Sequence, residues 1–471
     1  MMINEKILNE KCAVFGIFNA PKVASNQAYF GLFALQHRGQ EQSGIVSTDG
    51  KKLYAHKGSG LVSQIFTKEI IGKLKGSAAI GHNRYSTSRG TDPKYAQPIV
   101  INNTVAFAHN GNLPSTKALE VFLKKNKIST KDNSDSELMA KAIGVYMKKG
   151  SSLSEAIENA YPLFTGAFSC VALSKNELVA FRDPRGIRPL VLGKGGSEIV
   201  VASETCAFRT VGADLVREIL PGEMVVISKK GIKSKILAKA DPKFDIFEFV
   251  YFSRHNCTVM GKSVYQVRKN FGKILYEENP KLKIDIIVPV PETALPAAIG
   301  YSQASGVPFE LALNKNRYIN RTFIEPIQNT RDQKLKIKLS ALRSVINGKR
   351  VGVIDDSIVR GTTSRPIVKM LFDAGAKEVH FMVSSAPVKF PDFYGIDTPK
   401  QEKLIASQKS IKEICEFLGA TSLSYLSIDG MVRATGLPKS RFCLSAFNGE
   451  YPLPIFEHEK DISYDSLKFK N

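Results

Sequence analysis

Residues 350–364 constrain the fold more than any other stretch, because they combine a strand pattern, a polar loop and the start of a helix in direct succession. Residues 351–354 are a short apolar run, and residues 364–371 have the apolar spacing of a helix that ends near Gly375. Two adjacent aspartates fall where the strand ends, and in an open α/β sheet that end is where ligands bind. The stretch therefore predicts a ligand-binding loop within an α/β domain.

The loop offers groups for both parts of a phosphorylated sugar. Asp355 and Asp356 supply carboxylates that accept hydrogen bonds from sugar hydroxyls or bind a metal ion. Gly361 lets the backbone approach closely, and three hydroxyl residues follow at a helix N-terminus, where free N–H groups and the dipole favour an anionic phosphate. A lone pair of aspartates or threonines would be an ordinary turn or helix cap, but the ordered combination indicates a ribose 5-phosphate ligand.

Residues 355–363 read Asp-Asp-Ser-Ile-Val-Arg-Gly-Thr-Thr. This string resembles the phosphoribosyl-pyrophosphate (PRPP) loop of type I phosphoribosyltransferases. Its sequence is similar to the form of the loop found in the amidophosphoribosyltransferase family. The resemblance implies an α/β domain with a parallel sheet and a PRPP site. The residues implied as PRPP ligands are Asp355, Asp356, Ser357, Arg360, Gly361, Thr362, Thr363 and Ser364.

The composition limits the classes of partner. The 471-residue chain has 66 Lys and Arg against 44 Asp and Glu, a formal net charge of +22, which would suit nucleic acid or phosphorylated substrates. The basic residues are scattered and no nucleic-acid motif accompanies them, so no nucleic-acid partner is predicted. No apolar run of about 18 residues occurs, so no membrane span is expected. Six dispersed cysteines without a Cys-x-x-Cys pair indicate a cytoplasmic protein with reduced thiols.

The first half of the chain begins with a strand pattern that carries a cysteine. Residues 12–18 alternate as a strand does, and a cysteine in such a strand is usually just a small hydrophobic residue. Further along, polar side chains follow apolar strands at residues 81–87 and 109–112, and residues 134–137 form a capping box before an amphipathic helix. Each segment is ordinary by itself, but polar groups gathered behind strands indicate a site.

In this order behind Cys12, these segments resemble the glutamine amidotransferase domain of the N-terminal-nucleophile hydrolases over about residues 12–221. The resemblance implies an α+β domain with four layers in the order αββα. It also implies that the side chain of Asn110 and the backbone N–H of Gly111 form an oxyanion hole for the tetrahedral intermediate.

The same resemblance assigns residues to the substrate glutamine. Arg84 would bind the α-carboxylate through the forked geometry of its guanidinium, and Asp135 would bind the α-ammonium group. Arg38 is expected only as a supporting residue.

The chemistry of amide hydrolysis explains why a cysteine close to the N-terminus would be used. The attacking group is a thiolate, but a free thiol has a pKa near ~8.5 and needs a base beside it. If residues 1–11 are removed as a propeptide, Cys12 gains an α-amino group with a pKa of roughly 7.7 to 8.0. Nucleophile and base then come from one residue.

A second strand-to-helix loop is expected to serve the pyrophosphate. Residues 284–290 form a buried-strand run that ends in Pro-Glu-Thr, and a carboxylate and a hydroxyl in such a loop suit pyrophosphate and Mg²⁺. Thr293 is thus predicted as a metal-site residue beside Asp355 and Asp356, with a helix-capping threonine as the alternative.

A basic stretch begins at residue 315 and shows no clear periodicity, which on its own is typical of a solvated loop. By resemblance this region is a flexible lid over PRPP. Lys315 and Arg317 would then bring positive charge to the departing pyrophosphate.

The cysteines argue against an iron–sulfur cluster. Some members of the resembled family bind such a cluster through four cysteines, one of them in a Cys-Phe-Tyr-Gly-Ile-Asp stretch. Here that stretch begins with Asp392, and near the C-terminus only Cys443 could match a ligand, so no cluster is predicted. Cys170 and Cys206 are expected in core strands, and Cys257, where the family usually has serine, is expected to be incidental.

Together the halves predict three segments: a propeptide at residues 1–11, a glutamine amidotransferase domain at 12–235, and a phosphoribosyltransferase domain with a C-terminal extension at 236–471. The resemblance implies transfer of ammonia from glutamine to PRPP, giving 5-phosphoribosylamine, glutamate and pyrophosphate in the first committed step of purine synthesis. It further implies Mg²⁺, a homotetramer and feedback inhibition by purine nucleotides.

Three alternatives remain open at this stage. A glucosamine-6-phosphate synthase would share the glutaminase half but lack the PRPP loop. A PRPP-binding regulatory protein with a vestigial glutaminase domain would fit the positive charge and would bind nucleic acid in a salt-dependent way. A degenerate enzyme would use free ammonia alone and show no glutaminase activity.

Overall fold

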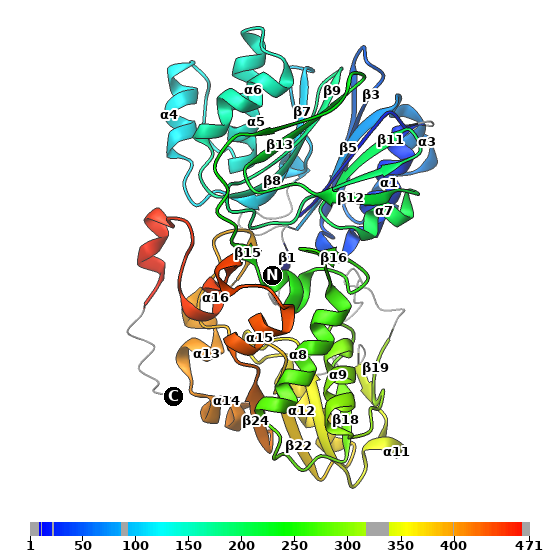
Figure 1. Cartoon of the computed structure of the whole chain (residues 1–471), viewed down its shortest axis with the longest axis vertical. Helices are drawn as coiled ribbons and strands as arrows, with labels where there is room; N and C mark the ends of the chain where they lie inside the picture. Colours follow the sequence, from blue (N-terminus) through cyan, green and yellow to red (C-terminus); the bar gives the residue numbers. More distant parts are fainter. Residues whose placement is uncertain are drawn as a thin grey trace.

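The chain folds into two stacked domains, with the amino-terminal domain at the top of Figure 1. The structure, a computed structural model, describes residues 9–10, 12–20, 23–85, 93–316, 339–398 and 400–463. Among these residues, no helix combines the length and the apolar character that a membrane crossing requires.

The amino-terminal domain contains two antiparallel sheets. The first has seven strands in the order β12 (Asp214–Glu218), β10 (Val191–Gly195), β11 (Glu198–Ala202), β2 (Ala13–Phe18), β5 (Ala78–Arg84), β3 (Gln42–Thr48) and β4 (Leu53–Ser59). The second has six strands in the order β14 (Gly231–Ile236), β13 (Glu223–Ser228), β9 (Glu177–Arg182), β8 (Ala167–Leu173), β7 (Val105–Asn112) and β6 (Ile99–Ile101).

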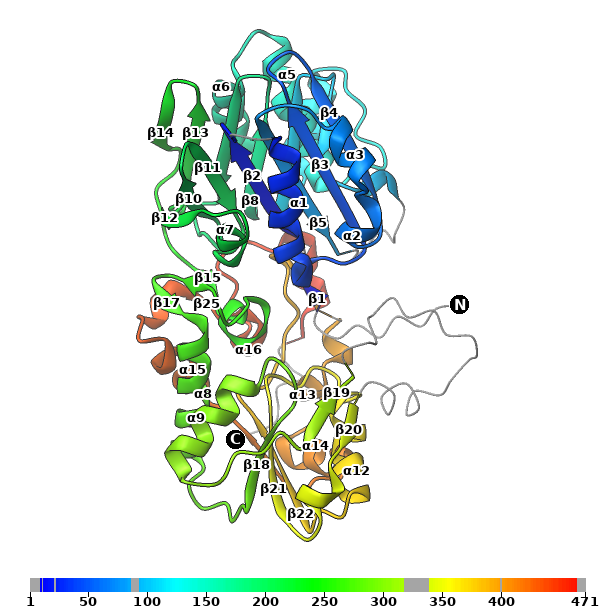
Figure 2. The same cartoon turned by 90° about the vertical axis from the view of Figure 1, so that its right-hand side faces the viewer.

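The alternation of strand side chains explains why helices cover both outer faces. In β2, Val14 points into the apolar layer between the two sheets, whereas Phe15 and Ile17 pack on the opposite side among residues of α1. Figure 2 shows α1 lying across the seven-stranded sheet. The domain therefore has the predicted αββα layers. The helices outside the first sheet are α1 (Ala24–Ala34), α2 (Val62–Ile65), α3 (Lys68–Lys73) and α7 (Cys206–Thr210); those outside the second are α4 (Lys117–Lys125), α5 (Asp135–Lys148) and α6 (Leu153–Ala160).

The second domain is built on a parallel sheet, as predicted. Its strand order is β18 (Ile286–Pro289), β21 (Arg350–Asp355), β22 (Glu378–Val383) and β24 (Ser422–Tyr425). Consecutive residues of β21 face opposite ways, since Val353 packs with α12 (Ser364–Asp373) and α14 (Ile411–Leu418), and Ile354 packs with α8 (Val264–Glu278) and α9 (Leu295–Ser305). Both faces of the sheet are thus covered by helices.

Two glycines allow α8 and α9 to pack closely. A Cβ atom on Gly272 would lie 1.7 Å from the carbonyl oxygen of Ala297, and one on Gly300 would lie 1.9 Å from that of Lys269. Any side chain at either position would push the helices apart.

Several short strands and helices complete the second domain, and some of them lie where the two domains meet. β19 (Leu313–Lys315) pairs with β20 (Leu339–Ala341), and β15 (Phe244–Asp245) pairs in parallel with β25 (Phe442–Cys443). Near the N-terminus, β1 (Asn9–Glu10) pairs with β23 (Ile396–Asp397). The remaining elements are β16 (Thr258–Val259), β17 (Lys262–Ser263), α11 (Arg343–Ile346), α13 (Ile405–Gln408), α15 (Ile428–Thr435) and α16 (Ser445–Asn448).

Most local predictions from the sequence are confirmed. The expected strand at residues 351–354 is β21, and the expected helix beginning at Ser364 is α12. The capping box before α5 forms, with Ser134 Oγ accepting from the N–H of Glu137 and Glu137 Oε2 accepting from the N–H of Ser134. Cys206 lies in the core as predicted, but the expected strand is wrong, because this residue begins helix α7.

The domains meet at a buried cluster of charges. Arg38 Nη2 lies 2.7 Å from Glu248 Oε1, and Arg38 Nη1 lies 2.5 Å from Glu204 Oε1, with all three side chains fully buried. Arg188 pairs with Glu248 at 2.8 Å and with Asp245 at 3.1 Å. Burial alone would raise the pKa of Glu248, but the charges of the two guanidinium groups outweigh it and lower that pKa.

We expect Glu248→Ala to lower the free energy of unfolding by about 3–5 kcal/mol, because it removes the buried carboxylate that two guanidinium groups share and leaves each with only one carboxylate partner. The matched control is Glu277→Ala, whose side chain is 44% exposed and pairs with Lys273 at 3.8 Å. The control should change stability by less than about 0.5 kcal/mol. Urea unfolding of both full-length variants measures the difference, and equal midpoints would contradict the importance of the cluster.

Candidate active sites

The first candidate site is a cavity of about 880 Å³ at the lower edge of the amino-terminal domain. Cys12 stands immediately before β2, with a backbone φ of 72° and 8% of its surface exposed, and it lines this cavity. The other residues expected to act on glutamine that line it are Arg84, Gly111 and Asp135.

Asn110 and Gly111 lie near the end of strand β7, and Gly111 lines this cavity. The Asn110 side chain is fully buried, and among the described residues neither atom of its amide group has a hydrogen-bond partner. Buried amides are normally paired, so an unpaired one is a preformed donor for an incoming oxygen. Gly111 has a φ of 150°, and a Cβ there would lie 2.0 Å from the carbonyl oxygen of Ala167. Only glycine fits this backbone position.

Arg84 and Asp135 carry opposite charges on the cavity wall. Arg84 donates from Nη1 to Gln42 Oε1 at 2.8 Å, and its guanidinium lies 5.5 Å from the centre of the Tyr95 ring. Asp135 Oδ2 accepts from the N–H of Leu113 at 3.2 Å and lies 3.8 Å from His109 Nδ1. One fixed cation and one fixed anion in a single cavity suit the carboxylate and ammonium of an α-amino acid.

Sequence reasoning missed part of the cavity wall, because that part comes from the second domain. Asp392, Phe393, Ile396 and Thr398 line the cavity. The carbonyl oxygen of Phe393 accepts a 2.8 Å hydrogen bond from the Asn112 side chain, which joins the two domains directly at the site. The sequence of this segment carried no sign of this role, since the contact spans 281 positions.

The second candidate site lies at the carboxyl end of the parallel sheet. Asp355 is the last residue of β21, and its Oδ1 accepts from the N–H of Asp356 at 2.9 Å. Ser357 Oγ donates to Asp356 Oδ1 at 2.6 Å. The backbone N–H of Ser384, just after the neighbouring strand β22, donates to the carbonyl oxygen of Asp355 at 2.9 Å. The two carboxylates are therefore held at the strand edge that the sequence predicted.

The two carboxyl groups disfavour each other's ionised form. Burial, and then the charge of Asp356, raises the pKa of Asp355 well above its usual range. Burial also raises the pKa of Asp356 to about 6, although Ser357 and Arg268 oppose the shift. Sugar hydroxyls or a hydrated divalent cation would stabilise the charged pair, so this donor set fits Mg²⁺.

Thr293 belongs to the same site. Its side chain hydrogen-bonds to Asp356 and thereby lowers the carboxyl pKa. The first residue of α9 is Leu295 and its cap position is Ala294, so the expected alternative, a capping threonine, does not apply. Arg268 on α8 was missed as a site residue, although it is buried and its charge acts on Asp356.

The phosphate part of the loop leads directly into α12. Gly361 adopts a φ of 71°, and its carbonyl oxygen accepts from the N–H of Arg365 at 3.1 Å. Thr363 occupies the cap position of α12 but makes no side-chain capping bond, so its hydroxyl is not used as an ordinary helix cap. The remaining predicted ligands are Ser357, Arg360 and Thr362, which lie on the same loop between β21 and α12, and Ser364, which is the first residue of α12.

Of the two residues predicted to belong to the lid, the structure describes only Lys315. Lys315 ends β19, and its Nζ lies 3.7 Å from Glu292 Oε1 in the expected pyrophosphate loop. This places one predicted cation beside Thr293. Arg317 lies outside the described residues.

The cysteines are all free thiols. Cys443 Sγ lies 3.2 Å from Ser445 Oγ, and the charged groups near it are Asp245 and Asp392. Cys206 and Cys257, by contrast, lie close to each other.

Comparison with known proteins agrees with this architecture. A family model described as a glutamine amidotransferase domain matches residues 82–210. The amidophosphoribosyltransferase of Bacillus subtilis is 44% identical over 470 residues, covering 97% of each chain. That of Synechococcus elongatus is 46% identical over 461 residues, covering 96% of this chain and 93% of the relative. The structure of glutamine phosphoribosylpyrophosphate amidotransferase from Bacillus subtilis complexed with ADP and GMP has a TM-score of 0.88 at 44% identity, covering 95% of this chain and 98% of that one.

The fold defines a class of protein in which an N-terminal-nucleophile glutamine amidotransferase domain is joined to a type I phosphoribosyltransferase domain. Two domains of these types in one chain describe an enzyme that moves nitrogen from glutamine to a phosphorylated sugar. The chain belongs to the amidophosphoribosyltransferase family.

Because the buried amide of Asn110 is unpaired among the described residues, we expect its replacement to lower the free energy of unfolding less than replacement of a paired buried amide. Asn83, also fully buried, donates to the carbonyl oxygen of Leu32 and accepts from Ser43 Oγ, both at 2.8 Å. We expect Asn83→Leu to lower the free energy of unfolding by at least about 2 kcal/mol more than Asn110→Leu, because only the former strands buried polar partners. Denaturant unfolding of the two variants tests this, and equal losses would mean that the Asn110 amide is paired in the protein.

Proposed function

We propose that this chain is an amidophosphoribosyltransferase that uses glutamine, PRPP and water to make 5-phosphoribosylamine, glutamate and pyrophosphate, the first committed step of purine synthesis. The observation that carries the proposal is the presence of two complementary sites in one chain. A cavity with Cys12 and fixed charges of both signs lies in one domain, and the Asp355–Asp356 loop lies in the other.

The glutaminase half would work as follows, with residues 12–235 as its domain. After removal of residues 1–11, the α-amino group of Cys12 takes the thiol proton, and the thiolate attacks the side-chain amide of glutamine. Asn110 and the N–H of Gly111 stabilise the oxyanion. Ammonia leaves, and water hydrolyses the thioester to glutamate. Arg84 and Asp135 hold the substrate by its α-carboxylate and α-ammonium groups.

The synthase half would occupy residues 236–471. Asp355 and Asp356 hold the ribose hydroxyls, and the loop ending at Ser364 binds the 5-phosphate with its hydroxyls and backbone N–H groups. Ammonia attacks C1 of the sugar, and pyrophosphate leaves toward Thr293 and Lys315. Arg317, a predicted lid residue outside the described residues, would add positive charge. Mg²⁺, when held with Asp355, Asp356 and Thr293, would neutralise charge on the pyrophosphate.

Ammonia has to reach PRPP before water protonates it. The part of the cavity wall that runs from Asp392 to Thr398 belongs to the second domain, so ammonia would be released at the domain boundary and not at the outer surface. This placement supports direct transfer between the two halves.

The remaining properties follow from family membership and are also proposals. We infer a homotetramer from the family resemblance alone. We also infer inhibition by purine nucleotides, which is supported by the structure of the Bacillus subtilis relative complexed with ADP and GMP. We infer no iron–sulfur cluster, because Asp245 and Asp392 surround Cys443 in place of thiols. Six free cysteines fit a reducing cytoplasm.

Replacing the nucleophile should separate the two activities. We expect Cys12→Ala to lower glutamine-dependent phosphoribosylamine synthesis by at least about 10³-fold, because the thioester cannot form, while ammonia-dependent synthesis is retained. Glutamate release and pyrophosphate release are measured side by side with each nitrogen donor. Cys415→Ala, which changes a partly exposed thiol on α14, is the control and should keep both activities. Loss of ammonia-dependent synthesis in Cys12→Ala would contradict the division of labour.

Replacing a carboxylate of the predicted PRPP loop should instead lower synthesis with both nitrogen donors. Asp356→Asn should lower synthesis by about 10²-fold or more with both glutamine and ammonia, because the site loses a charge that acts on the transferring sugar. Asp373→Asn is the control, since its side chain is 52% exposed and pairs with Lys369 at the far end of α12. Full activity of Asp356→Asn with ammonia would place the sugar site elsewhere.

A further inference from the structure

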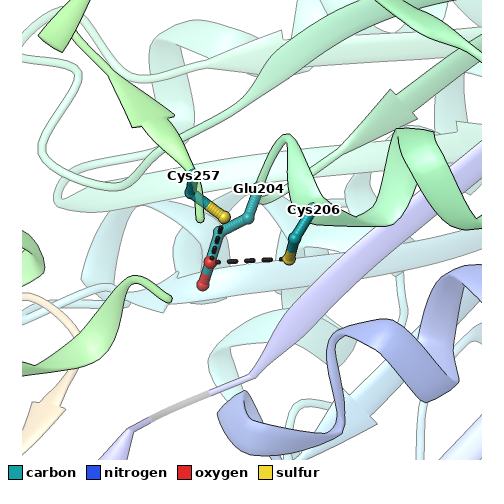
Figure 3. Close-up of side chains that lie close together, drawn as sticks. All are labelled: Glu204, Cys206 and Cys257. Atoms are coloured by element: carbon teal, nitrogen blue, oxygen red, sulfur yellow. Dashed lines mark hydrogen bonds between the residues drawn. The ribbon is translucent and has the colours of Figure 1, made fainter. Parts of the chain in front are cut away.

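Three side chains that the proposed reaction does not use meet at the domain junction. Glu204 and Cys206 come from the amino-terminal domain, at the start of α7, and Cys257 comes from the turn before β16 in the second domain (Figure 3). Cys206 is 4% exposed and Cys257 is 2% exposed. Within the part of the chain that the structure describes, they form the one group of three whose possible ligand atoms all lie within 4.8 Å of one another.

Both sulfur–oxygen spacings are close to those of a tetrahedral metal site, and the two sulfur atoms lie within 4.8 Å of each other. Cys257 Sγ lies 3.1 Å and Cys206 Sγ lies 3.7 Å from the same oxygen, Glu204 Oε2. Metal–sulfur bonds of about 2.3 Å and metal–oxygen bonds of about 2.1 Å at tetrahedral angles put the two ligand atoms about 3.6 Å apart. Both observed distances lie within about half an ångström of that value, so a small shift of the Cys257 side chain would complete the geometry.

The other oxygen of Glu204 is already fixed from behind. Oε1 lies 2.8 Å from His37 Nε2 and 2.5 Å from Arg38 Nη1. Burial alone would raise the pKa of Glu204, but the charges of His37 and Arg38 outweigh it and hold that pKa well below its usual range. The carboxylate is therefore ionised and oriented with Oε2 toward both sulfur atoms, as outer hydrogen bonds commonly orient metal ligands.

Charge balance permits a dication at this buried place. In the structure both thiols donate to Glu204 Oε2, and the hydrogen bond with Cys206, followed by burial, raises the pKa of Cys257. A divalent ion that binds two thiolates displaces two protons to the buffer, so the net charge of the junction does not change. The exchange thus adds no uncompensated charge to the buried cluster around Arg38.

We propose that Glu204, Cys206 and Cys257 form a binding site for Zn²⁺ that clamps the two domains together, with water as the fourth ligand. Two thiolates and one carboxylate are ligands that Zn²⁺ accepts, and thiolates disfavour Mg²⁺ and Ca²⁺. The site is separate from the magnesium site proposed at Asp355 and Asp356. Cys257, which sequence reasoning regarded as incidental, supplies the ligand from the second domain.

Cobalt spectroscopy on the full-length protein tests the proposal. The reduced chain is treated with a chelator, freed of it, and titrated with Co²⁺. We expect one equivalent to give a thiolate-to-cobalt charge-transfer band in the near ultraviolet and the visible bands of tetrahedral Co²⁺, and Zn²⁺ to abolish both. No such bands in the wild-type chain would overturn the proposal and leave three side chains that only hydrogen-bond to one another.

Serine variants assign the ligands. Cys206→Ser and Cys257→Ser should each weaken Co²⁺ binding by at least about 10-fold, whereas Cys170→Ser, a buried thiol in the core of the amino-terminal domain, should bind as the wild type does. Zn²⁺ should raise the thermal midpoint of the wild type and of Cys170→Ser but not of Cys257→Ser. If Cys206→Ser or Cys257→Ser bound Co²⁺ as tightly as the wild type does, the metal would be assigned to other residues. Circular dichroism of each variant establishes that the variant is folded.

Discussion

The arrangement of both sites depends on the buried pairing of Arg38 with Glu204 and Glu248. All three side chains are fully buried, so each would be costly to bury without the others. The pairing joins the domains, because Glu248 lies beyond the last strand of the amino-terminal sheets, in the π-helical turn Glu248–Phe252. It also reaches the first site, since Arg38 Nε lies 3.5 Å from the carbonyl oxygen of Cys12. A carboxylate outside the two sheets therefore helps to fix the backbone of the predicted nucleophile.

The same junction leads toward the PRPP loop. Ser253 Oγ donates to Glu248 Oε2 at 2.8 Å, and the carbonyl oxygen of Ser253 accepts from Arg268 Nη2 at 2.8 Å. The charge of Arg268 in turn lowers the pKa of Asp356, against the larger effect of burial. Hydrogen bonds thus connect Glu248 through Ser253 with Arg268, whose charge acts on a carboxylate of the second site. Because the groups are buried and paired, neither site can shift far without disturbing the junction.

Local patterns predicted the elements of each site, whereas the roles of most site residues were assigned by resemblance to a family. Tertiary contacts account for what was missed. β21, the loop with Asp355 and Asp356, and α12 are contiguous in the chain, so the apolar run and the helix spacing were sufficient. The sequence gives no periodic signal for Phe393 at the glutamine cavity or for Cys257 beside Glu204. Their partners lie 281 and 53 positions away, and such contacts depend on how the domains dock.

Asp392 shows how this chain supports the cavity wall with its own side chains. Some members of the resembled family have a cysteine at this position. Here Asp392 Oδ1 accepts from the N–H groups of Tyr394 and Ile396, both at 2.8 Å, and so bends residues 392–396 into the wall. Burial, and then the charge of Asp392, raises the pKa of nearby Asp245 to about 8. The charge of Arg188, which lies 3.1 Å from Asp245, opposes this shift. The hydrogen bonds that Asp392 accepts thus hold residues 392–396 where Phe393 contacts Asn112 at the cavity.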